Sequence, residues 1–193
     1  MAVAVIITHP DVTIDPSVPV PDWPLSSRGQ ARMRAALAQP WVRTLRAVHS
    51  STERKATDAA GILAAHLTLP FTTHADLGEN DRSATGYLPR EEFEATADAF
   101  FANPDHSISG WETARAAQRR IVTAVNAILA ATPRDHDIAL ITHGAVATLL
   151  FCALENLPIS RIHDQPPGTG GFYYAIDIAT RLTRHGWIPI DAE

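Results

Sequence analysis

Hydrophobic and polar positions alternate along the chain in blocks that predict strands followed by helices. Residues 3–8 and 137–142 are predominantly apolar runs rich in β-branched side chains, the pattern of strands buried on both faces of a parallel sheet. Four more segments are predicted as strands, at 45–49, 71–74, 172–178 and 182–188. We expect the last two to be antiparallel and joined by a tight turn near residue 180.

The segments between these runs have apolar residues every three or four positions, as on the buried face of a helix. The clearest predicted helix is 111–131. The other predicted helices are 27–38 after a capping box of Ser27 and Gln30, 52–66 with N-caps offered by residues 50–52, 89–101 with Pro89 in its first turn, and 146–155.

This alternation of strands and helices predicts an α/β fold. We expect three α/β/α layers around a mostly parallel central sheet, with an antiparallel carboxyl-terminal strand. At 193 residues the chain is predicted to form a single domain. A proline-rich loop, 10–24, follows the first strand, and segment 76–110 is expected to form an insertion over the site.

Composition narrows the classes of function. A net charge of −5 argues against a nucleic-acid-binding protein, which usually presents a basic face. No apolar stretch reaches the ~18 residues of a membrane span, and no basic leader precedes the first strand. We therefore expect a cytoplasmic protein without a membrane partner. The single cysteine, Cys152, is expected to be a buried apolar residue. The oligomeric state is open, with a dimer as one candidate.

Two strands end in the same dipeptide, Thr8-His9 and Thr142-His143, each followed by a residue that breaks the strand. Ligands of open α/β sheets bind beyond the carboxyl ends of the strands. The sequence therefore predicts that His9 and His143 face each other across a site, although more than a hundred residues separate them.

Three polar segments are expected at the same end of the sheet. Arg54 lies in the first turn of a predicted helix, where free backbone N–H groups and a guanidinium favour an anion. The loop 77–82 presents carboxylates and Arg82, and glycines at 168–171 allow a ligand to approach the backbone closely. The chain contains neither a dinucleotide-binding GxGxxG motif nor a GxxxxGK[ST] phosphate loop.

With these motifs in this order, the chain resembles the histidine phosphatase superfamily, in its phosphoglycerate-mutase-like branch. His9 follows its strand where the family has Arg-His-Gly, and residues 24–31 resemble the family's Pro-Leu-Thr-x-x-Gly-x-x-Gln-Ala region. Residues 50–59 resemble its Ser-Pro-x-x-Arg-Ala segment, residues 77–86 its Leu-x-Glu loop, and residues 141–144 its second His-Gly motif.

The resemblance implies phosphomonoester hydrolysis through a phosphohistidine on His9. Arg54 and His143 would hold the phosphoryl oxygens, and Glu79 would protonate the leaving oxygen, with Asp81 as its substitute. Neither a metal nor another cofactor is implied. The expected substrate is a phosphorylated small molecule, and mutase activity is the less favoured reaction.

Thr8 stands where the family has the arginine that clamps the phosphate. Losing that contact should cost about 2–4 kcal/mol of transition-state stabilisation, or roughly 30- to 1,000-fold in rate. Arg82, and after it Arg28, are the candidates to replace the missing charge. Thr8 itself and Gly171 are further candidates for substrate contact.

Two alternatives stay open. The first is a catalytically silent descendant of the family that binds a phosphorylated metabolite or protein, which the missing arginine favours. The second is a metal site built from His9, His143 and Glu79, which a neighbouring Arg54 would oppose by repelling a cation.

Overall fold

A computed structural model describes residues 2–192 and confirms the predicted α/β fold class. Its sheet has six strands in the order β3-β2-β4-β1-β5-β6. The strands span Val3–Thr8 (β1), Leu45–Ser50 (β2), Phe71–Thr73 (β3), Asp137–Thr142 (β4), Phe172–Asp177 (β5) and Ile188–Pro189 (β6). The first four strands are parallel, and β5 pairs antiparallel with both β1 and β6.

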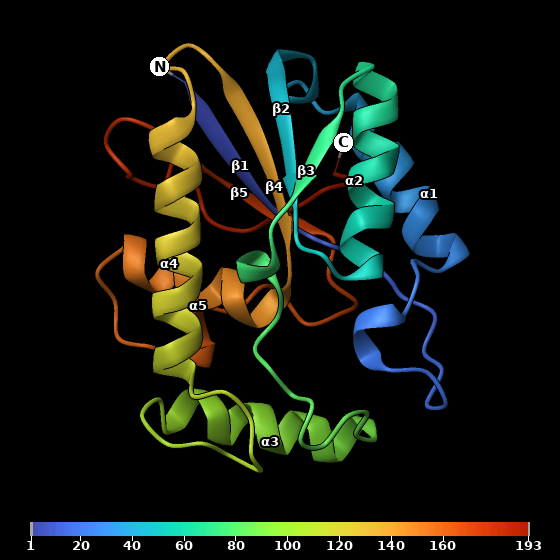
Figure 1. Cartoon of the computed structure of the whole chain (residues 1–193), viewed down its shortest axis with the longest axis vertical. Coiled ribbons are helices and arrows are strands. Elements are labelled where there is room, and N and C mark those ends of the chain that lie inside the picture. Colours follow the sequence, from blue (N-terminus) through green and yellow to red (C-terminus); the bar gives the residue numbers. More distant parts are fainter. Residues whose placement is uncertain (1, 193) are drawn as a thin grey trace.

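Five α-helices accompany the sheet in the described residues. They span Ser27–Ala35 (α1), Arg54–Leu67 (α2), Arg90–Ala102 (α3), Ala114–Ala131 (α4) and Gly144–Leu154 (α5). Figure 1 shows α4 and α5 on one side of the sheet and α1 and α2 on the other. No helix in residues 2–192 is both long and apolar enough to cross a membrane.

The core consists of two buried layers, because alternate side chains of each central strand point to opposite faces. On one face Ile6 and Leu140 pack with Ile121 of α4. On the other face Ile7 and Ile141 pack with apolar side chains of α1 and α2. Strands β1 and β4 are therefore covered on both sides, which explains why their sequences are apolar almost throughout.

Some predicted boundaries differ from the structure. Helix α4 begins at Ala114 rather than 111, because the Thr113 hydroxyl accepts a hydrogen bond from Ala116 N and caps the helix there. Ser26, not Ser27, caps α1 by accepting from Gly29 N. The second carboxyl-terminal strand is reduced to β6 and one bridge between Ile176 and Thr183.

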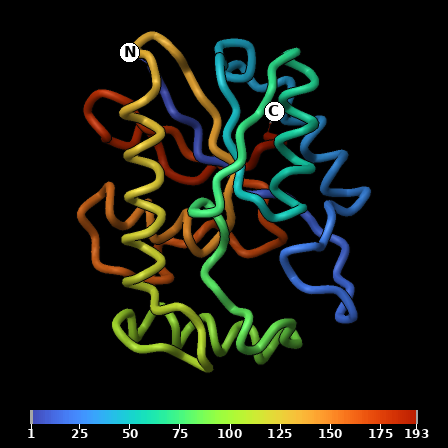
Figure 2. The backbone as a smooth tube through the Cα atoms, in the orientation of Figure 1, coloured from blue at the N-terminus to red at the C-terminus, as the bar shows by residue number. Residues whose placement is uncertain are grey.

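The carboxyl ends of the parallel strands lie toward α3, which crosses the bottom of the view in Figure 1. The connections that leave this end are the loop 10–24 after β1 and the segment from β3 to α4 that contains α3. Figure 2 shows the first in blue beside the start of α2 and the second in green. The backbone N–H of His9 donates to Thr142 O (3.1 Å), so the two histidine-bearing strand ends lie side by side.

Candidate active site

The structure brings His9 and His143 together, with their ring centroids 5.1 Å apart in an edge-on arrangement. Both rings follow adjacent parallel strands, whose last paired residues are Thr8 and Thr142. His143 is completely buried. Burial lowers the pKa of His9 to about 4, with help from the positive charge of Lys55, and lowers the pKa of His143 well below its ordinary value. Both imidazoles are therefore neutral at pH 7.

A hydrogen bond fixes the tautomer of His9. Its Nδ1 lies 2.9 Å from the carbonyl oxygen of Pro10. A carbonyl oxygen can only accept, so Nδ1 carries the proton and Nε2 of the neutral ring keeps a lone pair. The backbone carbonyl of His9 is held in turn by the N–H of Gly171 (3.1 Å).

The glycine loop supports His9 through a close backbone approach. Gly170 and Gly171 both have φ near +75°, a conformation that costs side-chain-bearing residues energy. A Cβ on Gly170 would lie 2.3 Å from the carbonyl oxygen of His9. The carbonyl of Gly171, a residue predicted as a candidate for substrate contact, accepts from the guanidinium of Arg32 at 3.1 Å. These glycines therefore position the backbone of His9.

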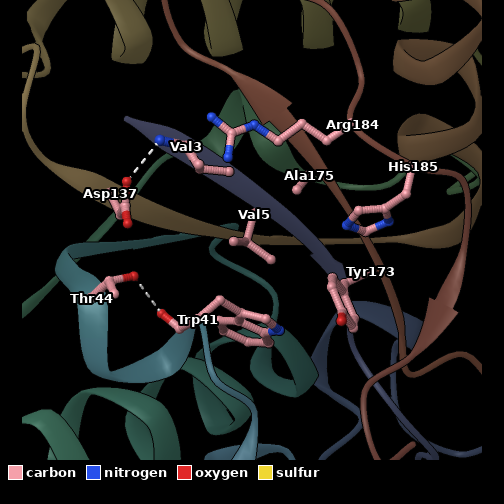
Figure 3. Close-up of a pocket in the computed structure, with 9 residues that line it drawn as sticks. All are labelled: Val3, Val5, Trp41, Thr44, Asp137, Tyr173, Ala175, Arg184 and His185. Carbon is pink, nitrogen blue, oxygen red and sulfur yellow. Dashed lines mark hydrogen bonds between the residues drawn. The ribbon is translucent and has the colours of Figure 1, made fainter. Parts of the chain in front are cut away.

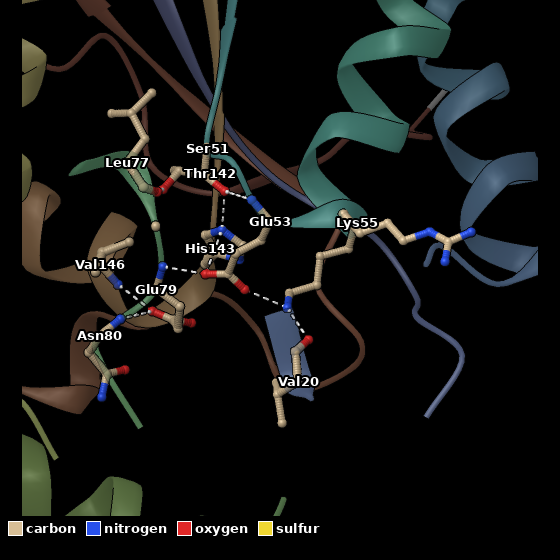
Figure 4. A network of polar contacts seen from close by, with 12 residues as sticks. Val20, Ser51, Glu53, Lys55, Leu77, Glu79, Asn80, Thr142, His143 and Val146 are labelled. Atoms are coloured by element: carbon tan, nitrogen blue, oxygen red, sulfur yellow. Dashed lines mark hydrogen bonds and ion pairs between the residues drawn. The ribbon is translucent and has the colours of Figure 1, made fainter. Parts of the chain in front are cut away.

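A carboxylate and a lysine from the start of α2 complete the inner part of the site. Glu53 lies 3.3 Å from His143 Nε2 through Oε1 and 2.5 Å from Lys55 Nζ through Oε2. The hydroxyl of Ser51 lies 2.6 Å from the same His143 nitrogen. Lys55 also donates to Val20 O in the proline-rich loop at 2.8 Å. Figure 4 shows this network between α2, the loop that carries Glu79, and His143.

Arg54, the cation expected at the histidines, is exposed to solvent. Successive helical residues point about 100° apart, so the side chain of Lys55 turns inward and is only 4% exposed. The signal was present in the sequence. Counted back from Ala56, the basic position of the family's Ser-Pro-x-x-Arg-Ala segment is residue 55.

Glu79 lies at the amino-terminal end of α5. Its carboxyl group accepts hydrogen bonds from the N–H groups of Ala145 (3.3 Å) and Val146 (3.2 Å). Burial raises the pKa of Glu79, the nearby negative charge of Glu53 adds to the effect, and the positive charge of Arg82 opposes it. Asp81, the substitute acid, is exposed, and hydrogen bonds from Ser83 lower its pKa. Glu79 is thus the better proton donor of the two.

The candidate replacement cations have different surroundings. The guanidinium of Arg82 lies 5.1 Å from the ring centroid of Phe93 and 5.6 Å from that of Trp111, and its charge acts on His9, Glu79 and His143. Arg28 is 75% exposed and lies 3.4 Å from Asp11. The structure therefore brings Arg82 to the site and leaves Arg28 at the surface.

The hydroxyl of Thr8 has local partners. It donates to Gln165 Oε1 (2.7 Å) and accepts from the N–H of Phe172 (3.0 Å). Thr142 likewise donates to Leu77 O at 2.7 Å. Both threonines join the strand ends to neighbouring segments, which keeps the histidines in place.

Two buried nitrogen atoms near Glu79 have no hydrogen-bond partner, His143 Nδ1 and Asn80 Nδ2. Unpaired buried polar atoms are rare and call for a specific explanation, such as a catalytic role. Within residues 2–192 no group of three or more His, Cys, Asp or Glu side chains is arranged to hold a metal ion. The alternative metal site of His9, His143 and Glu79 is therefore not formed.

Two cavities lie elsewhere in the molecule. One, of about 240 Å³, lies beside the amino-terminal half of β1 and is lined by Trp41, Tyr173 and His185, among others (Figure 3). The second, of about 490 Å³, lies between β2 and α4 and includes His49 and His74. None of the residues that line either cavity is one of the candidate site residues. The candidate site is therefore identified from the side chains that meet around His9 and His143.

Comparisons with solved structures agree with the fold. A mycobacterial glucosyl-3-phosphoglycerate phosphatase aligns over 98% of this chain and 99% of its own, with a TM-score of 0.81 and 19% identity. The same enzyme with inorganic phosphate aligns over 100% of both chains, with a TM-score of 0.79 and 19% identity. YhfR of Bacillus stearothermophilus aligns over 100% of this chain and 98% of its own, with a TM-score of 0.78 and 20% identity.

No curated protein sequence matches the chain. The sequence model of the histidine phosphatase superfamily (branch 1) matches residues 17–176. The matched region contains Glu79 and His143 and begins after Thr8-His9-Pro10, the motif that departs from the family pattern. Because the match covers most of the chain, this protein belongs to branch 1 of the histidine phosphatase superfamily.

Proposed function

We propose that this protein is a metal-independent phosphatase that hydrolyses phosphomonoesters through a phosphohistidine on His9. The hydrogen bond from His9 Nδ1 to Pro10 O carries the proposal. It leaves the lone pair of Nε2 available for attack on phosphorus, and the lowered pKa of His9 keeps that lone pair unprotonated at neutral pH.

In the first step Nε2 of His9 forms a bond to phosphorus while the bond between phosphorus and the ester oxygen breaks. Glu79, whose pKa is raised by burial, gives its proton to the leaving oxygen and becomes a carboxylate. In the second step that carboxylate takes a proton from water as the water oxygen attacks phosphorus. The P–N bond breaks, its electron pair returns to Nε2, and inorganic phosphate leaves.

Positive charge near the phosphoryl group comes from Lys55 and Arg82 in this proposal. Lys55 takes the role first expected of Arg54, and Arg82 supplies the second charge from the loop that carries Glu79. Cationic side chains stabilise the negative charge spread over the phosphoryl oxygens in the transition state. His143, held by Ser51 and Glu53, is the neighbouring polar group on the other side of His9.

The expected substrate is a phosphorylated small molecule in the cytoplasm. The phosphatase that resembles this chain in fold is named for glucosyl-3-phosphoglycerate, which belongs to that chemical class. Because the identity is only 19%, the particular substrate is not transferred to this chain.

A second candidate function is phosphate binding without turnover. It is favoured by the contact of Glu53 with Lys55, which neutralises a cation that would otherwise meet the phosphate. The proton donor Glu79 speaks against it, because a binding protein has no need of a buried acid with a raised pKa.

Turnover of a panel of phosphomonoesters, without added metal, tests the proposal. We expect phosphate release by the unaltered protein, loss of it in His9→Ala, and retention in His66→Ala, a control at an exposed histidine of α2. Equal phosphate release by His9→Ala would overturn the phosphohistidine mechanism. Absence of release from all three proteins, with phosphate still bound, would support the silent binding function.

A further inference from the structure

The carboxylate of Glu53 is largely buried and contacts His143, the ring beside His9. Only 13% of its side chain is exposed. Besides its contacts with Lys55 (2.5 Å) and His143 (3.3 Å), it accepts a hydrogen bond from the backbone N–H of Glu79 at 2.9 Å. These partners outweigh the effect of burial and lower the pKa of Glu53 to about 2. Glu53 is therefore a permanent negative charge within the site.

The other charged groups around His9 can be counted. Lys55 joins Glu53 from the start of α2, Arg82 and Glu79 come from the loop before α3, and His143 comes from the end of β4. Lys55 and Arg82 are cations, Glu53 is an anion, the lowered pKa values of His9 and His143 keep both rings neutral, and Glu79 holds the proton that the first step of the proposed function requires. The net charge of these six groups is therefore +1.

Two other arginines near this end of the sheet, Arg32 and Arg120, already have partners, and Arg54 is exposed to solvent. Arg32 contacts Asp11 and Asp191 at 2.9 Å each. Arg120 pairs with Glu112 at 2.8 Å and donates to the backbone carbonyls of residues 76, 78 and 79. Releasing either one would leave buried or half-buried acceptors without a partner, which costs more than an exposed ion pair does.

A tetrahedral anion with one negative charge would balance the net charge of +1 that these six groups carry. A second negative charge would be left uncompensated a few ångströms from Glu53, in surroundings where charges interact several times more strongly than in water. We propose that this site selects phosphoryl groups that carry a single negative charge, and that Glu53 determines the selection. The inference rests on the proposed function, because it concerns the same site.

Two kinds of substrate have this charge, a phosphomonoester in its singly protonated form and a phosphodiester. The second ionisation of a monoester lies at about pH 6, so monoesters meet the requirement mainly in mildly acidic solution. Diesters meet it at any pH. Attack by His9 on either one forms the P–N bond and releases the ester oxygen with the proton of Glu79, as in the steps above.

Anion binding tests the selection without requiring turnover. Calorimetry would compare inorganic phosphate with sulfate at about pH 5.5 and about pH 8, because phosphate changes from mainly one to mainly two charges over this range while sulfate keeps two. Any change in sulfate affinity between the two pH values therefore reports protonation of the protein, and it is subtracted from the change in phosphate affinity. We expect phosphate, after this correction, to bind about tenfold more tightly at the lower pH. An equal pH response of the two anions would overturn the inference.

The role of Glu53 is tested by Glu53→Gln, with Glu53→Leu as a second variant and Glu91→Gln as the control at an exposed glutamate of α3. At about pH 8 we expect the Glu53 variants to raise kcat/KM for p-nitrophenyl phosphate about tenfold. Turnover of the diester methyl p-nitrophenyl phosphate should not rise. A parallel change for both substrates, or none for either, would refute the role of Glu53 in selection.

The binding and turnover experiments distinguish a failure of this inference from a failure of the proposed phosphatase function. Selective binding of singly charged phosphate without turnover of any ester would overturn the phosphatase proposal and support the inference. Turnover that depends on His9 but favours the doubly charged monoester at about pH 8 would support the phosphatase and overturn the inference. Turnover of the diester by the unaltered protein would identify diesters, rather than protonated monoesters, as the source of the single charge.

Discussion

Replacing Lys55 by methionine removes one charge from the site and keeps most of the apolar stem. In the native protein the ammonium contacts Glu53 at 2.5 Å and donates to Val20 O at 2.8 Å, and the side chain is almost fully buried. The variant therefore loses a cation beside His9 and leaves one oxygen of Glu53 without its partner.

The magnitudes follow from these contacts. Removing one partner of a buried ion pair costs about 3–5 kcal/mol. We expect about 3 kcal/mol here, because His143 and the N–H of Glu79 still contact Glu53. Loss of a cation that stabilises transition-state charge lowers kcat by about 100-fold or more. Arg54→Met, one residue earlier and exposed, should change the free energy of unfolding by less than about 0.5 kcal/mol.

Urea denaturation and steady-state turnover of a phosphomonoester would measure both effects in both variants. Comparing kcat within the folded baseline separates the catalytic effect from unfolding. If Arg54→Met lost most of the activity while Lys55→Met kept it, the assignment of the inner cation to Lys55 would be refuted.

Three further predictions concern the acid, the glycine loop and pH. Glu79→Gln should lower kcat at least about 100-fold, because the amide cannot donate a proton to the leaving oxygen; a smaller loss in steady-state turnover would point to another acid. Gly170→Ala should cost about 1–3 kcal/mol in urea denaturation, since its Cβ would collide with the carbonyl of His9, and an unchanged midpoint would contradict this geometry. The pKa of His9 is about 4 in the folded protein and about 6.5 in the unfolded chain. The unfolded chain therefore binds the extra proton first, and stability should fall as pH drops from about 6.5 to about 4, by up to about 3 kcal/mol from this group. His9→Ala should show a shallower decline, and an identical slope would contradict the lowered pKa.

The sequence predicts the central strands well because a strand covered on both faces requires apolar side chains at nearly every position. β1 and β4 span the predicted residues, since both faces of each strand are covered by helices and demand apolar side chains at nearly every position. The edge strand β6 was predicted too long. Within segment 182–188 only Thr183, through one bridge, and Ile188, as the first residue of β6, pair with the sheet, and Leu182 at the start of the segment is exposed.

Part of the candidate site can be predicted from sequence motifs, and the rest depends on side-chain directions and contacts that only the structure shows. His9 and His143 directly follow strands, and Glu79 lies in a short loop. For such residues the sequence motif is enough to predict that they lie at the carboxyl end of the sheet. The sequence predicts Arg54 as the phosphate-binding cation, whereas Lys55 is the residue that turns inward, because on a helix one residue changes the direction of a side chain by about 100°. Glu53 had no pattern to indicate it, because its importance comes from its contacts with Lys55 and His143.

Trapping the phosphoryl enzyme tests the central claim most directly. A substrate labelled in its phosphoryl group would be mixed with the protein for a short time, quenched under conditions that preserve phosphohistidine, and the labelled peptide sequenced. We predict label on His9 in the unaltered protein and none in His9→Ala. Phosphate release without any labelled histidine, or label on a residue other than His9, would contradict the account.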